Sequence, residues 1–249
     1  MNRQSNTYTV IYASVLVLVV GIVLSVVYQA LRPAQVENIS NDTKRQILAA
    51  ARITAAPGES VASLYESHIT DSYIVDASGK RVDNSTPALD VNVGMESKKP
   101  TAERLLPVFE CKTDNGMKYI LPVYGAGLWG PIWGYIAFDD NGDTIYGAYF
   151  AHQGETPGLG AEIEKPAFSD QFEGKNVFSQ SGEFESVAVV KNGQEPQDRA
   201  WVHAISGGTI TSQGVSKMLA DSLEPYTNFL KSLAEKTSAG ANATETVKE

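Results

Sequence analysis

The segment at residues 204–215 (AISGGTITSQGV) places two glycines among several hydroxyl side chains, at the start of a helix-like stretch. Ser212 or Thr211 would cap such a helix, which surrounds the preceding turn with free backbone N–H groups. Those donors and the helix dipole attract anions, phosphate above all, and the Gly207-Gly208 pair lets the backbone approach a ligand closely. No lysine follows the glycines, so the segment matches neither the P-loop nor the dinucleotide-binding pattern.

Two further segments contain residues suited to ligand binding. Residues 152–163 (HQGETPGLGAEI) hold several glycines and a proline without helix or strand periodicity, which predicts a rigid loop able to bring peptide groups to a ligand. Residues 127–139 (GLWGPIWGYIAFD) begin with apolar side chains able to form a wall beside a ring. On the residues alone, an ordinary surface turn and a piece of core are the simpler interpretations.

The composition limits the classes of function. A chain of 249 residues allows one sizeable domain with an appendage, or two small domains. The net charge is -9 and the basic residues form no aromatic-interleaved cluster, so nucleic acid is not an expected partner. Cys111 is the single cysteine, which excludes an intrachain disulfide, and we expect it to be a buried, inert thiol.

The N-terminal stretch at residues 7–31 has no charged residue and is rich in Val, Leu, Ile and Ala. It exceeds the ~20 residues that cross a hydrocarbon core and the roughly 7 to 15 of a signal-peptide core, so we interpret it as an uncleaved membrane anchor. Arg3 lies before the stretch, and Arg32, Lys44, Arg45 and Arg52 lie after it. Because the charge rule is weak for long translocated domains, the charge bias leaves the orientation open.

The elements that must position these segments begin with helices after the anchor. A helix is predicted over residues 35–55, capped by Asn41 or Asp42 and ended at Pro57. A short helix follows around Leu64, and then a hairpin at 71–83 and a polar surface connection at 84–104.

Strand patterns dominate from residue 105 onward, and Asn141-Gly142 supplies a hairpin turn between two of them. The final amphipathic stretch, 212–223, is predicted to be a helix that Pro225 ends. We therefore expect an α+β fold on a mostly antiparallel sheet with flanking helices. The predicted strands lie within residues 105–112, 117–125, 133–139, 144–152, 185–192 and 200–205.

The run at residues 206–215 (SGGTITSQGV) resembles the S/T-G-A-T-x-T-S-x-G-V signature of membrane proteins that carry flavin mononucleotide (FMN) as a phosphoester on threonine. The segments at 127–139 and 152–163 agree with that family in the order it requires, and with the anchor they cover most of the chain. The chain resembles the C subunits of sodium-translocating NADH:quinone reductases more closely than the related G subunits of Rnf-type ferredoxin-linked complexes.

The resemblance implies that the FMN phosphate is esterified to the hydroxyl of Thr209, by a separate flavin transferase. It also implies a cofactor site, within which the polar pair Glu155 and Thr156 would hydrogen-bond to the flavin. The candidate cofactor-binding residues are Thr209, Ser206, Gly207, Gly208, Thr211, Glu155, Thr156, Gly158, Leu159, Gly160, Leu128, Trp129 and Trp133. Two positions depart from the family pattern, since His203 replaces the usual acid and Gly208 the usual alanine.

The function that the resemblance implies is electron relay by the covalent FMN, between iron–sulfur and flavin subunits of a respiratory sodium pump in a bacterial inner membrane. The flavin domain would lie on the periplasmic side, with no residue of this chain acting as an acid, base or nucleophile. The implied divisions are a tail (1–7), a transmembrane helix (8–31), a membrane-proximal helical and hairpin region (32–98), the FMN-binding domain (99–235) and a disordered tail (236–249).

Three alternatives stay open at this point. The first is the flavin subunit of an Rnf-type ferredoxin:NAD oxidoreductase, and the second is a membrane-anchored ligand-binding domain without redox function. The third is a hydrolase in which Ser206 or Thr209 is the nucleophile and His152 or His203 the base, although no G-x-S-x-G elbow is present.

Overall fold

The computed structural model describes residues 6–245; residues 1–5 and 246–249, at the ends of the two expected tails, lie outside the described part. The chain divides into two units, Met1–Thr43 and Lys44–Glu249. Each unit is described by itself.

A single helix, α1 (Asn6–Ala50), contains the expected membrane span. An 18-residue window of it reaches a mean hydropathy of 2.9 with none of its residues buried, so the helix is long and apolar enough to cross a membrane. The prediction of a separate helix starting at Asn41 or Asp42 is wrong, because both residues lie inside α1. Pro33 lies inside it too, and the loss of its one N–H donor does not end the helix.

The end of α1 belongs to the second unit and comes before Pro57. Arg52 adopts a φ of 62°, and the N–H of Ile53 donates to the carbonyl of Leu48 at 3.0 Å, which closes the last turn. The short helix predicted around Leu64 is confirmed as α2 (Val61–His68), with the Ser60 side chain accepting from the Ser63 N–H.

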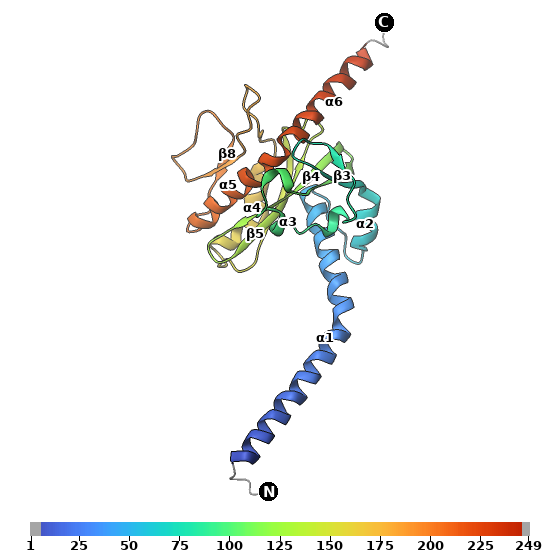
Figure 1. Ribbon diagram of the computed structural model, residues 1–249. Helices are drawn as coiled ribbons and strands as arrows, with labels where there is room; N and C mark the ends of the chain where they lie inside the picture. The colour runs from blue at the N-terminus through green and yellow to red at the C-terminus, as the bar shows by residue number, and fades with distance from the viewer. Residues whose placement is uncertain (1–5, 246–249) are drawn as a thin grey trace. The chain divides into compact units, whose positions relative to one another are not determined.

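The core of the second unit is a six-stranded antiparallel sheet in the order β2-β1-β3-β4-β5-β6. Figure 1 labels three of these strands, β3, β4 and β5. The predicted hairpins and the four strands predicted between residues 105 and 152 are confirmed. In the turn between the last two strands, the side chain of Asn141 accepts from the N–H groups of Asp143 and Thr144, and Gly142 has a φ of 66°. The strands are β1 (Ile69–Val75), β2 (Arg81–Val82), β3 (Leu106–Thr113), β4 (Gly116–Ala126), β5 (Pro131–Phe138) and β6 (Ile145–His152).

Both faces of the sheet are covered. On one face, Ile132 and Ile136 of β5 join the core cluster that includes Val215 and Leu219 of α5 (Thr209–Leu223). On the other face, Ala137 joins a second cluster with the end of α1. Because side chains alternate along a strand, each residue of β5 is committed to one of these two layers.

The predicted strands near residues 185–192 and 200–205 form a separate parallel pair, β7 (Ala188–Val190) and β8 (Trp201–His203). The expected surface connection at 84–104 contains three short helical turns, η1 (Ala88–Asp90), α3 (Val93–Glu96) and η2 (Thr101–Glu103). Between β6 and β7 lie η3 (Gly160–Glu164), α4 (Pro166–Ser169) and η4 (Asp170–Phe172).

The C-terminal helices pack their apolar side chains onto the sheet. The face of α5 predicted from the sequence is buried as expected. Pro225 ends it at η5 (Glu224–Tyr226), and α6 follows (Thr227–Glu245). The helix α6 therefore runs into the segment 236–249 for which the composition favours disorder.

Candidate functional site

Three segments meet around a cavity of about 370 Å³ at one end of the sheet. They are the turn between β4 and β5, the loop that follows β6, and the start of α5 with the turn before it. These are the three segments that the sequence singles out. The residues that line the cavity are Leu128, Trp129, Glu155, Thr156, Leu159, Gly160, Gly207, Gly208, Thr209, Ile210 and Thr211.

Ten of the thirteen candidate residues line this cavity, and Ser206, Gly158 and Trp133 do not. Trp133 lies on β5 between Ile132 and Gly134, and its indole N–H donates to the side-chain oxygen of Gln46 at 3.0 Å. Since Ile132 faces α5, alternation turns Trp133 toward the opposite layer of the sheet.

Sequence reasoning missed Ile210. It follows the candidate Thr209 and is exposed in the first turn of α5. The available signal in the sequence is an isoleucine that falls outside the apolar face formed by Val215, Met218 and Leu219 of the same helix.

The helix α5 begins at Thr209, with Gly208 as its N-cap and no side-chain cap hydrogen bond. The prediction that Ser212 or Thr211 caps this helix is therefore wrong. Both side chains are buried and bond elsewhere: Ser212 Oγ accepts from the Ile205 N–H at 3.0 Å, and the Thr211 hydroxyl donates to Glu155. The first-turn N–H groups of α5 are thus not bonded by a cap side chain.

Glu155 connects the three segments. One carboxylate oxygen accepts from the Trp129 backbone N–H at 2.8 Å, and the other accepts from the Thr211 hydroxyl at 2.5 Å. The residue is 5% exposed. Its own backbone N–H donates to His152 Nδ1 at 3.1 Å.

Four apolar side chains at the cavity are strongly exposed: Leu128 is 47%, Trp129 67%, Leu159 42% and Ile210 54% accessible. Among the described residues of Lys44–Glu249, Met95 is the one other large hydrophobic side chain in this class. Exposed apolar groups gathered at a cavity are typical of a ligand-binding or interaction site.

Neither histidine considered as a general base is bonded to a candidate nucleophile. His152 accepts from the Glu155 N–H, and its Nε2 lies 3.7 Å from Glu164. His203 is exposed at the end of β8, and its ring centroid is 4.9 Å from that of Trp201. The hydrogen bonds of the described residues join neither ring to Ser206 or Thr209, so nothing in this region supports a hydrolase.

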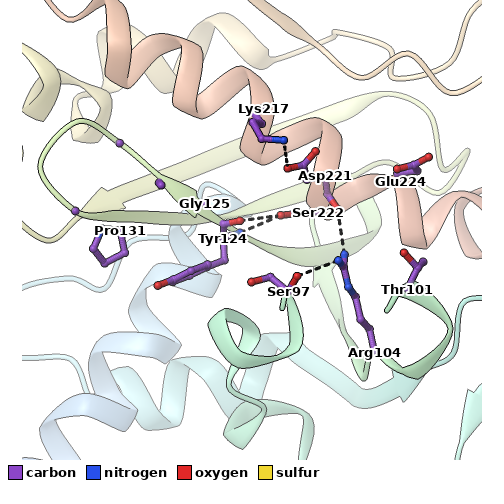
Figure 2. Close-up of a pocket in the computed structure, with 13 residues that line it drawn as sticks. Ser97, Thr101, Arg104, Tyr124, Gly125, Pro131, Lys217, Asp221, Ser222 and Glu224 are labelled. Carbon is purple, nitrogen blue, oxygen red and sulfur yellow. Dashed lines mark hydrogen bonds and ion pairs between the residues drawn. The ribbon is translucent and has the colours of Figure 1, made fainter. Parts of the chain in front are cut away.

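A larger cavity of about 650 Å³ lies on the other side of the β4–β5 turn, between that turn, α5 and the segment after α3. Figure 2 shows that its cations already have partners within the chain. Arg104 donates to the carbonyl oxygens of Ser97 and Asp221, and Lys217 pairs with the Asp221 carboxylate at 2.7 Å. Asp221 and Glu224 add negative charge to the same walls, so this cavity does not select one sign of ligand.

The smaller cavity suits FMN on three counts. Its volume lies in the usual range of cofactor pockets, about 300–1,000 Å³. The start of α5 offers backbone N–H donors for a phosphate, with no cap side chain in their place. The exposed apolar side chains offer surfaces for a planar ring. Among the described residues, no group of three or more His, Cys, Asp or Glu side chains could hold a metal ion.

Comparison with known proteins agrees with this geometry. The FMN-binding domain family matches residues 127–224, which include all three cavity segments. The C subunit of the Na(+)-translocating NADH-quinone reductase from Pseudomonas aeruginosa is 31% identical over 240 residues, covering 88% of this chain and 91% of the relative.

Two crystal structures share the fold. The C subunit of the Na(+)-translocating NADH-quinone reductase from Parabacteroides distasonis is 46% identical with a TM-score of 0.74, and the match covers 80% of this chain and 96% of that one. NqrC from Shewanella oneidensis is 26% identical with a TM-score of 0.66, covering 78% and 97%. The chain therefore belongs to the NqrC family, the C subunits of the Na(+)-translocating NADH-quinone reductases.

Proposed function

We propose that this chain is the electron-relay subunit of a sodium-translocating NADH:quinone reductase and that it carries FMN as a phosphoester on Thr209. The observation that carries the proposal is the cavity in which three segments, distant in sequence, bring an uncapped helix start and four exposed apolar side chains together. A phosphoester needs donors for its remaining charge, and a ring system needs apolar walls.

The residues of the chain bind and orient the cofactor. The hydroxyl of Thr209 belongs to the first residue of α5, so an ester formed there places the phosphate beside the first-turn N–H groups. Leu159 and Trp129 would flank the ring, and the exposed Thr156 is available for a hydrogen bond. Gly207 and Gly208 let the chain pass close to the phosphate.

When bound, FMN supplies one-electron transfer between an iron–sulfur centre and another flavin of the complex. The protein contributes binding, orientation and exclusion of water from part of the ring. No side chain of this chain is assigned a proton-transfer role, and NADH oxidation and quinone reduction belong to other subunits.

The placement in the cell follows from α1. Its exposed apolar stretch would anchor the chain in a bacterial inner membrane as a single span, with the FMN domain on the periplasmic side. Iron–sulfur and flavin subunits of the same complex would be its partners, and a flavin transferase would attach the FMN.

In-gel flavin fluorescence of the denatured chain tests this proposal. The full chain is co-expressed with a flavin transferase, and the peptide that contains Thr209 is analysed by mass spectrometry. We expect a fluorescent band and an FMN adduct on Thr209, lost in Thr209→Ala and retained in Ser206→Ala, which removes a hydroxyl outside the cavity. A folded wild-type chain without the adduct would contradict the covalent linkage. A folded chain that also binds no FMN would favour a ligand-binding domain without redox function.

A further inference from the structure

The carboxylate of Glu155 is engaged on both of its oxygens. The Trp129 N–H donates to one at 2.8 Å and the Thr211 hydroxyl to the other at 2.5 Å, and the residue is almost fully buried. Hydrogen bonds to a buried charged group are among the stronger ones in proteins. The three residues come from the three segments that line the cavity.

Two glycines leave room for this carboxylate. A Cβ on Gly160 would lie 2.3 Å from one oxygen of Glu155 and 2.4 Å from the Thr211 hydroxyl. A Cβ on Gly127 would lie 2.5 Å from the other oxygen. Glu155 therefore sits in a slot that any larger residue at these positions would close, and its position is narrowly defined.

We propose that Glu155 is a positioning residue that holds the β4–β5 turn, its own loop and the first turn of α5 in fixed positions relative to one another. The four exposed apolar side chains of the cavity, which we call the ring seat, are then in place before FMN binds. They are Leu128, Trp129, Leu159 and Ile210. This inference rests on the proposed function, because the seat concerns FMN. It differs from the sequence expectation, in which Glu155 bonds to the flavin directly.

The exposed walls of the cavity explain why such a residue is needed. Trp129 is 67% exposed, so packing contacts do little to fix its side chain. The position of the indole therefore depends on the position of the Trp129 backbone. That backbone is bonded to Glu155 at the Trp129 N–H. Releasing this bond would free the turn and move Trp129 relative to Thr209, across the cavity.

A glutamine at this position separates geometry from charge. In Glu155→Gln, the amide oxygen can still accept from Trp129 and the amide nitrogen can donate to the Thr211 oxygen. The connection between the segments is kept while the charge is lost. Glu155→Ala removes both bonds, and Thr211→Val removes one of them with little change in shape.

The experiment uses the full chain in detergent with FMN attached, and measures flavin fluorescence intensity and anisotropy. An indole beside a flavin quenches its fluorescence, so a loosened seat should raise the intensity and lower the anisotropy. In Glu155→Ala and in Thr211→Val, we expect the fluorescence intensity to rise several-fold and the anisotropy to fall. In Glu155→Gln, we expect both quantities to stay near their wild-type values. The double variant Glu155→Ala with Thr211→Val should show the same intensity and anisotropy as Glu155→Ala alone, since the two residues share one interaction. The control, Glu173→Ala, removes an exposed acid whose partner is Arg52.

Hydrogen exchange on the flavin-free chain supplies a second readout. We expect protection of the Trp129 amide to fall about tenfold or more in Glu155→Ala, the effect of losing one hydrogen bond to a charged group, and to stay unchanged in Glu173→Ala. Lower thermal stability with unchanged anisotropy and exchange would overturn the positioning role. So would a Glu155→Gln variant as impaired as Glu155→Ala. A wild-type chain that takes up no FMN would instead reject the proposed function, and the exchange data would decide separately whether Glu155 holds the segments.

Discussion

Adding a single methyl group at Gly160 should break the bond between Glu155 and Thr211. The added Cβ would come within 2.3 Å of one partner and 2.4 Å of the other, well inside van der Waals contact. Both atoms are side-chain ends, so the backbone can stay in place while the two side chains separate. The cost is then the lost hydrogen bond to a buried carboxylate.

That loss is worth about 1.5–3 kcal/mol of unfolding free energy, the range for hydrogen bonds to charged groups. For a domain of this size, each kcal/mol lowers the melting temperature by about 2–4 °C, so Gly160→Ala should melt roughly 3–12 °C below the wild type. The measurement is thermal unfolding of the flavin-free full chain, followed by circular dichroism.

Gly154→Ala is the matched control. It lies in the same loop, and its added Cβ would meet no atom nearer than the Trp129 carbonyl oxygen at 3.9 Å, an ordinary contact. We expect its melting temperature to stay within about 2 °C of the wild type, as for a surface substitution. Equal melting temperatures for the two variants would refute the reasoning, since the slot around Glu155 could then accept a methyl group without loss.

Further predictions concern groups away from the cavity. Cys111 is fully buried, and burial raises the pKa of its thiol from 9.0 to about 11, so thiol reagents at pH 8 should label it only after unfolding. Because that folded-state pKa is raised, the free energy of unfolding should hold below about pH 9 and fall as the pH rises toward 11, as urea titrations at a series of pH values would show. Asp139→Asn should destabilise the chain by about 2 kcal/mol, since it removes the negative charge that pairs with the buried Lys118 ammonium at 2.7 Å, while the ammonium keeps its bond to the Asn115 carbonyl and Asp139 is itself partly exposed. Asp140→Asn, on the neighbouring exposed residue, should leave urea unfolding unchanged.

The strands β3 to β6 could be predicted because their signals are local. Alternating residues and the Asn141-Gly142 turn define β5 and β6 without knowledge of the rest of the chain. The face that each strand residue takes is different, because it depends on pairing and on which layer α5 covers. The aromatic character of Trp133 predicts a place at the ring, whereas its register turns it toward Gln46.

The predicted helix starts are wrong for a related reason. Asn41 is a good N-cap by residue type, but it lies inside α1. Because α1 begins far upstream, at Asn6, no helix start is needed at Asn41. At α5, the hydroxyls of Thr211 and Ser212 are suitable caps by type, while in the structure they bond to Glu155 and to the loop before the helix. Residue type predicts that a hydroxyl will bond nearby, and only the tertiary structure decides to which group.

The uncapped start of α5 and the buried hydroxyls form one arrangement. A serine or aspartate at position 208 would turn its own oxygen onto the first-turn N–H groups and compete there with a phosphate. Gly208 has no such oxygen, and neither has the alanine of the related signature, so this departure leaves the donors available. The carboxylate of Glu155, which lines the same cavity, is held by a side-chain hydroxyl and the N–H of another segment rather than by these donors. The N–H groups at the helix start thus remain for a ligand, while the Thr211 side chain of the same turn bonds to Glu155 and helps to position the walls.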